Sequence, residues 1–216
     1  EQTGDRGAQQ GSVDPAPLKK ELAADGGVED SKFEVGYMAA PVPFKKFLLV
    51  PVSENGSLWL HAIEKDGGKL AWKTFLCEDP MSGSSPWSPV GLAIGGGDAY
   101  IATGGGVVFA VDAMSGAVRW AVRYQRSTKG MMDMSRFGRP QQKLHGMDGF
   151  EEDIVIPHGR ALLVIASDSD KLFALDRRSG EMLWESPRRP TGEDDAGVYC
   201  LGVVDDALFI AGKESV

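Results

Sequence analysis

One segment recurs along this chain and constrains the fold more than any other feature. VVFAVDAMSGAVRW (residues 107–120) is matched by KLFALDRRSGEMLW (residues 171–184), and SLWLHAIEKDGGKLAW (residues 57–72) is a weaker copy. In each copy an apolar run ends at an acidic residue, a turn passes through a glycine, and a second run carries a tryptophan. The sequence therefore predicts the same β-hairpin three times, which is typical of a repeat architecture.

The turn of each hairpin explains the letters that the copies share. An aspartate side chain can accept hydrogen bonds from turn amides, a serine hydroxyl can do so more weakly, and glycine tolerates positive φ. The tryptophan four residues later adds a large apolar face and an indole N–H that needs an acceptor, so we interpret it as a packing anchor between sheets. The predicted docking motif comprises Asp112, Gly116, Trp120, Asp176, Gly180, Trp184, Gly68 and Trp72.

Pairs of apolar strands separated by tight turns alternate with these hairpins. They cover residues 36–52, 89–104, 152–167 and 199–212, and the first three pairs precede one copy of the repeated segment each. This gives four strands per unit. A four-stranded antiparallel sheet cannot bury both faces alone, so repeated sheets must stack, and radial stacking makes a β-propeller. We predict an all-β fold, a partial β-propeller of four-stranded antiparallel blades with about three and a half blades.

The pattern A-x-D-x-x-[ST]-G-x-x-x-W, at residues 110–120 and 174–184 and weakened at 62–72, carries a family resemblance. It resembles the tryptophan-docking repeat of the PQQ-like β-propellers (PQQ is pyrroloquinoline quinone). That superfamily includes quinoprotein alcohol dehydrogenases and the propeller lipoprotein of the bacterial outer-membrane assembly machinery. The resemblance covers residues 36 to 216 and is closer to the non-catalytic assembly type. It implies a periplasmic or secreted protein.

The repeat spacing sets the expected organisation. Residues 1–35 are predicted to be a polar tail or linker, and residues 36–216 a partial propeller with blades near 36–76, 85–124 and 152–188 and a half blade at 198–216. The docking tryptophans are 48 and then 64 residues apart, which places an inserted loop at 125–150. Three and a half blades do not close a ring. We favour a fragment whose missing blades belong to a longer chain; the alternatives are a homodimer that closes one ring and an open arc.

Composition excludes several kinds of partner. The 216 residues carry a net charge of −8, so a nucleic-acid backbone or an anionic membrane surface would be repelled on average. We therefore expect no nucleic acid, and no apolar run reaches the roughly 18 residues that span a bilayer. Cys77 and Cys200 lie far apart without metal-ligand spacing, and the sequence leaves open whether they pair.

The inserted loop holds the other candidate site residues. Met131, Met132, Met134 and His145 are soft ligands of the kind that could hold Cu(I), but methionines also anchor a long loop by packing, and we expect no metal. We favour contact with a partner, because loops on a rigid scaffold commonly carry binding residues. Trp87 lies out of register with the docking positions. We therefore group it with these four loop residues as a candidate partner surface.

We expect a non-catalytic scaffold that mediates protein–protein interaction and has no cofactor or catalytic residue. The alternatives are a fragment of a PQQ-dependent dehydrogenase, which would use PQQ with Ca²⁺, and a propeller that binds a small ligand. The vicinal cysteine pair of the dehydrogenases is missing here, since Cys77 and Cys200 are not adjacent. The strand at residues 207–212 would offer backbone groups to another chain if its edge is open.

Overall fold

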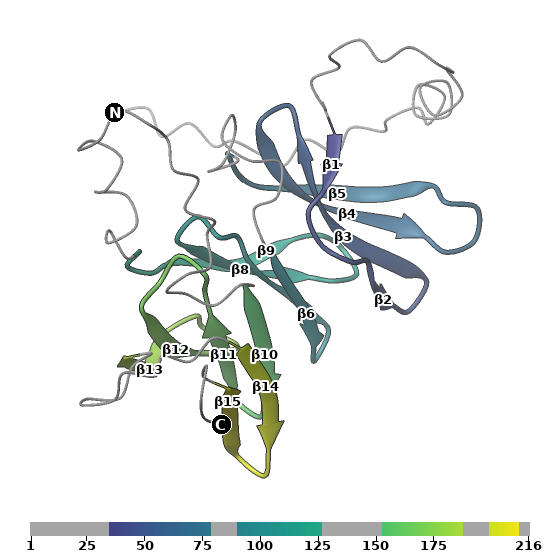
Figure 1. The fold of residues 1–216 in the computed structure, drawn as a ribbon. Helices are drawn as coiled ribbons and strands as arrows, with labels where there is room; N and C mark the ends of the chain where they lie inside the picture. Colours follow the sequence, from purple (N-terminus) through teal and green to yellow (C-terminus); the bar gives the residue numbers. More distant parts are fainter. Residues whose placement is uncertain (1–34, 79–89, 127–152, 188–198, 212–216) are drawn as a thin grey trace, which may run out of the picture.

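The computed structural model describes residues 35–78, 90–126, 153–187 and 199–211, and every regular element within them is a β-strand. Figure 1 shows the strands in chain order. They are β1 (Val35–Tyr37), β2 (Val42–Phe44), β3 (Phe47–Glu54), β4 (Ser57–Glu64), β5 (Leu70–Glu78), β6 (Gly91–Gly95), β7 (Asp98–Ala102), β8 (Val107–Asp112), β9 (Val118–Arg123), β10 (Ile154–His158), β11 (Ala161–Ile165), β12 (Lys171–Asp176), β13 (Met182–Pro187), β14 (Tyr199–Val204) and β15 (Ala207–Ala211).

The strands form four antiparallel sheets in which sequence neighbours are also neighbours in space. The first sheet has the order β1-β3-β4-β5, with β2 beside β1 on the same edge of β3. The second sheet is β6-β7-β8-β9, the third is β10-β11-β12-β13, and the fourth is the two-stranded ribbon β14-β15. Hairpin connections throughout explain why the turn residues dominate the sequence pattern.

The turns between the first two strands of a sheet are tight and use positive φ. Gly96 and Gly97 have φ of 66° and 98°, and Asp205 and Asp206 have 46° and 66°. Two successive residues with positive φ match the right-handed twist of the flanking strands. Glycine adopts this conformation freely, whereas aspartate is one of the few other residues that tolerate it.

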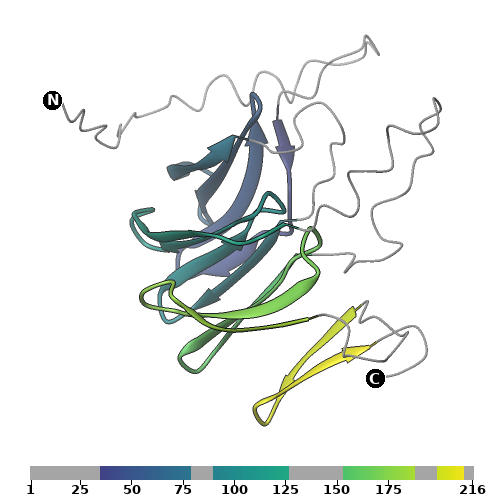
Figure 2. The same cartoon turned by 90° about the vertical axis from the view of Figure 1, so that its left-hand side faces the viewer.

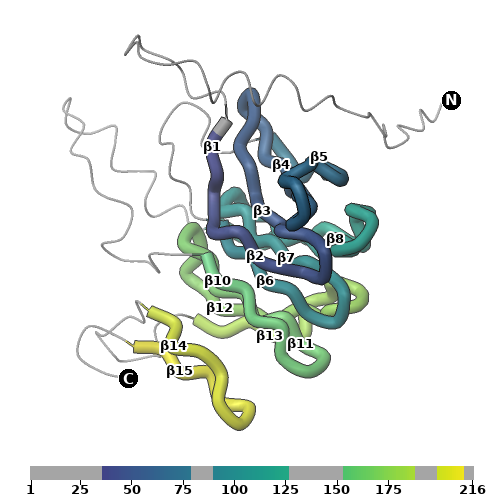
Figure 3. Tube along the Cα trace, turned by 90° about the vertical axis from the view of Figure 1, so that its right-hand side faces the viewer, coloured from purple at the N-terminus to yellow at the C-terminus, as the bar shows by residue number. Residues whose placement is uncertain are grey.

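The first three sheets fan out around a common side, as Figures 2 and 3 show. The inner strands of successive sheets touch: β2 contacts β6, β6 contacts β10, and β10 contacts β14. Outer strands lie on the rim, where every residue of β13 is exposed. This is the blade arrangement of a propeller, and the prediction of a partial, all-β propeller is confirmed.

The hydrophobic core lies between the sheets. One cluster joins the first and second sheets through residues such as Leu49, Leu60 and Ile101. A second cluster joins the second and third sheets around Tyr100, Trp120 and other apolar residues. Along β4 buried positions alternate with half-buried ones, because successive side chains point to opposite faces of the sheet. The sheets therefore depend on one another for burial, as in other repeat folds.

Candidate functional site

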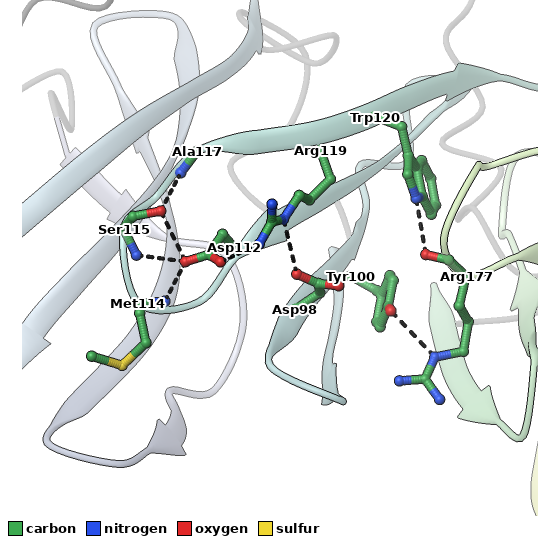
Figure 4. Close-up of polar contacts among 9 residues, drawn as sticks. All are labelled: Asp98, Tyr100, Asp112, Met114, Ser115, Ala117, Arg119, Trp120 and Arg177. Atoms are coloured by element: carbon green, nitrogen blue, oxygen red, sulfur yellow. Dashed lines mark hydrogen bonds and ion pairs between the residues drawn. The ribbon is translucent and has the colours of Figure 1, made fainter.

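The turn after β8 is organised by one carboxylate. Oδ1 of Asp112 accepts hydrogen bonds from the backbone N–H of Met114 at 3.0 Å and of Ser115 at 2.8 Å, and from the Ser115 hydroxyl at 2.8 Å (Figure 4). Gly116, with φ of 77°, donates its N–H to the carbonyl of Asp112. The bonds from Ser115 are the main reason that the pKa of Asp112 is lowered. Asp176 and Gly180 build the same turn after β12.

Each of these turns receives a tryptophan from the preceding sheet. Nε1–H of Trp72 on β5 donates to the carbonyl of Met114 at 3.0 Å, and Nε1–H of Trp120 on β9 donates to the carbonyl of Arg177 at 3.0 Å. The indole rings lie against the turn glycines: a Cβ on Gly116 would be 2.7 Å from the Trp72 ring, and one on Gly180 would be 2.9 Å from the Trp120 ring. Glycine is thus required at these turns for two reasons: the backbone has a positive φ, and the indole ring leaves no room for a Cβ.

The local sheet geometry that presents the tryptophan is the same in the three larger sheets. Trp72, Trp120 and Trp184 pair with alanines, Ala62, Ala110 and Ala174 respectively. The register shifts immediately after each alanine. Such a bulge bends the strand and redirects the neighbouring side chain. A small residue opposite the indole leaves space for the ring on the sheet.

Trp184 differs from the other two docking positions. It is 44% exposed, whereas Trp120 is 9% exposed. Met182 and Leu183 beside it on β13 are also exposed. Trp184 therefore presents its indole to the surface.

Two arginines add polar contacts, Arg119 within the second sheet and Arg177 between the second and third sheets. Arg119 bridges two strands of the second sheet, because it contacts Asp112 at 2.5 Å and Asp98 at 3.5 Å (Figure 4). The Nε–H of Arg177 donates to the hydroxyl of Tyr100 at 3.2 Å, and the Arg177 guanidinium lies over the Tyr100 ring. Arg177 thus receives Trp120 through its carbonyl and holds the second sheet through its side chain.

A shallow charged hollow of about 270 Å³ opens beside these arginines. It is lined by Gly96, Gly97, Asp98, Asp112, Arg119 and Arg178. Both carboxylates of this hollow already contact Arg119. Its two carboxylates therefore take part in contacts within the second sheet.

A larger exposed surface is apolar and lies at β13, β14 and β15. The ribbon packs Cys200, Leu208 and Ile210 toward Ile165 and Leu172 of the third sheet. The alternate side chains of the ribbon face outward and are exposed. We call these residues, together with the exposed part of β13, the β13–β15 surface: Met182, Leu183, Trp184, Tyr199, Leu201, Val204 and Phe209.

The partner residues predicted from the loops lie outside the described part of the chain. These are Trp87, Met131, Met132, Met134 and His145. The docking-motif residues are all described. Trp72 and Trp120 and the turns they contact lie at the two sheet junctions, whereas Trp184 is exposed on β13 and Gly68 has no atom within 4 Å of the position of a Cβ. The β13–β15 surface was not predicted as a unit; the alternation in YCLGVV and ALFIA was its available signal.

The structure gives no sign of a metal or redox centre in the part it describes. Cys77 on β5 and Cys200 on β14 form no disulfide with each other. Across residues 35–78, 90–126, 153–187 and 199–211, no group of three or more His, Cys, Asp or Glu side chains is placed to hold a metal ion. Within those ranges, no helix has the length and apolar character needed to cross a membrane.

Comparison with protein families identifies the repeat. The family model described as outer membrane protein assembly factor BamB matches residues 54–137, which include the first two docking tryptophans and the turn of the second sheet. The match covers less than half of the 216 residues. Over residues 54–137 the chain is similar to the PQQ-like repeat β-propellers. No curated protein sequence matches this chain.

Solved structures resemble this chain in fold, as judged from the two with TM-scores of 0.50 or more. A europium-containing methanol dehydrogenase has a TM-score of 0.52 at 15% identity, covering 72% of this chain and 25% of its own. A quinohemoprotein alcohol dehydrogenase from Pseudomonas putida HK5 has a TM-score of 0.50 at 16% identity, covering 73% and 21%. BamB from Moraxella catarrhalis has a TM-score of 0.49 at 20% identity, covering 82% and 46%. The chain thus spans less than half the length of each of these structures, and the likeness concerns the fold.

Proposed function

We propose that this chain is a non-catalytic β-propeller scaffold that binds a protein partner through the β13–β15 surface. The observation that carries the proposal is the exposure of aromatic and aliphatic side chains there, with Leu201 60% exposed and Trp184 44% exposed. Clusters of exposed large apolar side chains mark protein interaction sites more often than they mark free surface. Aromatic side chains such as these are also enriched among residues that dominate binding energy.

The backbone of this surface supports the same function. Among the described residues, β15 pairs only with β14, so its other edge has unpaired N–H and C=O groups. An edge strand with these groups and apolar side chains can accept a strand from another protein. We therefore propose that the partner contributes an extended segment with apolar side chains.

The matched family supports the location and the class of function. It is described as an outer membrane protein assembly factor, so its members act together with other proteins. We propose a periplasmic or secreted location for this chain on the same basis. Net charge −8 keeps such a scaffold away from anionic membranes and nucleic acids.

A PQQ-dependent dehydrogenase is the alternative that the structural neighbours suggest. Such a site needs several oxygen ligands for Ca²⁺. The described residues do not fit it, because among them no three His, Cys, Asp or Glu side chains are placed to hold a metal ion. In addition, the indoles of Trp72 and Trp120 already hold the turns of the next sheets.

The test is a binding measurement with a matched pair of variants. The tagged chain is used to capture proteins from a periplasmic or culture extract, and the affinity of the captured protein is then measured by titration. Leu201→Ser with Phe209→Ser should weaken binding at least tenfold, whereas Val118→Ser, an exposed apolar residue on β9, should not. Equal affinity of both variants, or no captured protein, contradicts the proposal. Alcohol oxidation after addition of PQQ and Ca²⁺ would establish the alternative instead.

A further inference from the structure

A buried carboxyl group without a cation lies at the junction of the second and third sheets. Asp153, immediately before β10, is 5% exposed. Its Oδ1 accepts a 2.6 Å hydrogen bond from the backbone N–H of Ser167, in the turn between β11 and β12. Its Oδ2 is buried and has no hydrogen-bond partner among the described residues. A buried carboxylate oxygen left in this state is costly, because nothing replaces the water it has lost.

The neighbouring carboxylate of Asp168 is paired with a cation, Arg126. Oδ1 of Asp168 accepts from the Tyr124 hydroxyl at 2.6 Å, and its Oδ2 accepts from Nε–H of Arg126 at 2.8 Å. Tyr124 and Arg126 follow β9, so these bonds join the second sheet to the third. The charged and titratable groups around Asp153 in the described chain are therefore Asp168, Tyr124 and Arg126.

The other side of Asp153 is closed by backbone. A Cβ on Gly91, at the start of β6, would be 2.5 Å from the carbonyl oxygen of Asp153. The inner strands β6 and β10 are thus in direct contact where Asp153 begins the third sheet. Separation of the two sheets here would therefore displace the backbone of Asp153 as well.

Electrostatics agree with this geometry. Burial raises the pKa of Asp153 to about 7, and the negative charge of Asp168 adds to the rise, while the bonds from Ser167 act in the opposite direction. The pKa of Tyr124 is also raised, by burial and by the two nearby carboxylates. A cation cage is not the better explanation, because both oxygens of Asp168 already accept bonds and no third ligand group is present in the described residues.

We propose that Asp153 is a proton-controlled latch between the second and third sheets of the propeller. As the neutral acid, it fits the dry junction and supports the 166–169 turn that bears Asp168. When the proton leaves, a second negative charge stands beside Asp168, whose own cation Arg126 is already paired with it, and the junction opens to admit water. The latch does not depend on the proposed partner surface, which lies at β13–β15.

Hydrogen exchange as a function of pH tests the latch. Protection of the Ser167 amide, corrected for the intrinsic exchange rate, should fall at least tenfold between pH 5.5 and pH 8 in the wild type. Asp153→Asn should remove this pH dependence. Asp170→Asn, an exposed aspartate two residues after Asp168 in the same turn, should behave as the wild type. Loss of protection that persists in Asp153→Asn, or a flat wild-type profile, overturns the proposal.

A direct titration covers the case in which Asp153→Asn does not fold. Carbon-13 NMR of the wild-type aspartate carboxyls should show one group, assigned to Asp153, with a midpoint near 7. A midpoint close to 4, the ordinary value for aspartate, overturns the latch. The titration is repeated with millimolar Ca²⁺. An unchanged midpoint supports a proton site. A clear downward shift of the midpoint, with amide protection restored at pH 8, would mean that Asp153 binds a cation and would also overturn the latch.

Discussion

The indole N–H of Trp120 donates a 3.0 Å hydrogen bond to the backbone carbonyl of Arg177, on the next sheet and 57 residues further along the chain. Arg177 follows Asp176 in the turn whose glycine lies against the same indole ring. Trp120 therefore contacts both the backbone and the glycine of a turn in the neighbouring sheet. Because Trp72 and Met114 repeat this relationship, the junctions between sheets are the units that determine stability.

Replacing the docking tryptophans by alanine should show unequal costs. Trp120→Ala removes a buried ring and its hydrogen bond, and we expect a loss of about 3–5 kcal/mol in the free energy of unfolding. Trp184→Ala should cost about 1 kcal/mol or less, because its side chain is 44% exposed and a surface substitution has little effect. Urea denaturation followed by circular dichroism measures both. Equal losses would contradict the docking role of Trp120.

Gly180→Ala tests the close approach of indole and turn. The added Cβ would need positive φ, here 76°, and would meet the Trp120 ring at 2.9 Å. Gly159→Ala is the matched control, since φ is 53° but no atom lies within 4 Å of the new Cβ. We expect Gly159→Ala to cost about 1 kcal/mol through strain and Gly180→Ala roughly 1–3 kcal/mol more. Thermal unfolding of both variants decides whether ring contact adds to the strain.

The sequence predicted the sheets because each repeat carries its own turn chemistry. Asp112, Gly116 and the alternation of apolar residues are local signals, and local signals define hairpins and their order. The partial propeller followed from the number of repeats. Which backbone carbonyl each tryptophan would reach could not be predicted, because this depends on how two sheets are placed relative to each other.

The junction around Asp153 was not predictable for a similar reason. Asp153 follows Glu151 and Glu152 in the sequence, and such an acidic run is usually solvated. Its burial arises only when β6 packs against β10. His158 shows the same limitation: it lies at a hairpin end, yet its Nε2 is 2.6 Å from Oδ1 of Asp206 on the ribbon. Contacts of this type depend on tertiary structure, and the spacing of residues along the sequence does not indicate them.

Tyr124→Phe should weaken the link between the second and third sheets. The change removes the 2.6 Å hydrogen bond to Asp168 and leaves the ring on Phe173. A hydrogen bond to a charged acceptor contributes about 1.5–3 kcal/mol, so we expect a loss within that range. Tyr37→Phe, at a position 64% exposed, should leave the free energy of unfolding within about 0.5 kcal/mol of wild type. Urea denaturation measures both variants. If Tyr124→Phe loses no more free energy of unfolding than Tyr37→Phe, the Tyr124 hydroxyl does not link the sheets.

Asp176 should stabilise the protein in a pH-dependent manner. The guanidinium of Arg160 and the amides of Arg178 and Ser179 lower its pKa from 3.8 to about 2. Because the folded state binds the proton less tightly than the unfolded state, the stabilisation is complete above about pH 4 and is lost as the pH falls through about 2. Asp176→Asn should therefore lower the melting temperature at pH 7, and its difference from wild type should shrink between pH 4 and pH 2. Asp66→Asn, an exposed aspartate in the turn of the first sheet, is the control and should show no such convergence. A constant difference between Asp176→Asn and wild type over this range would mean that the carboxylate charge does not stabilise the turn.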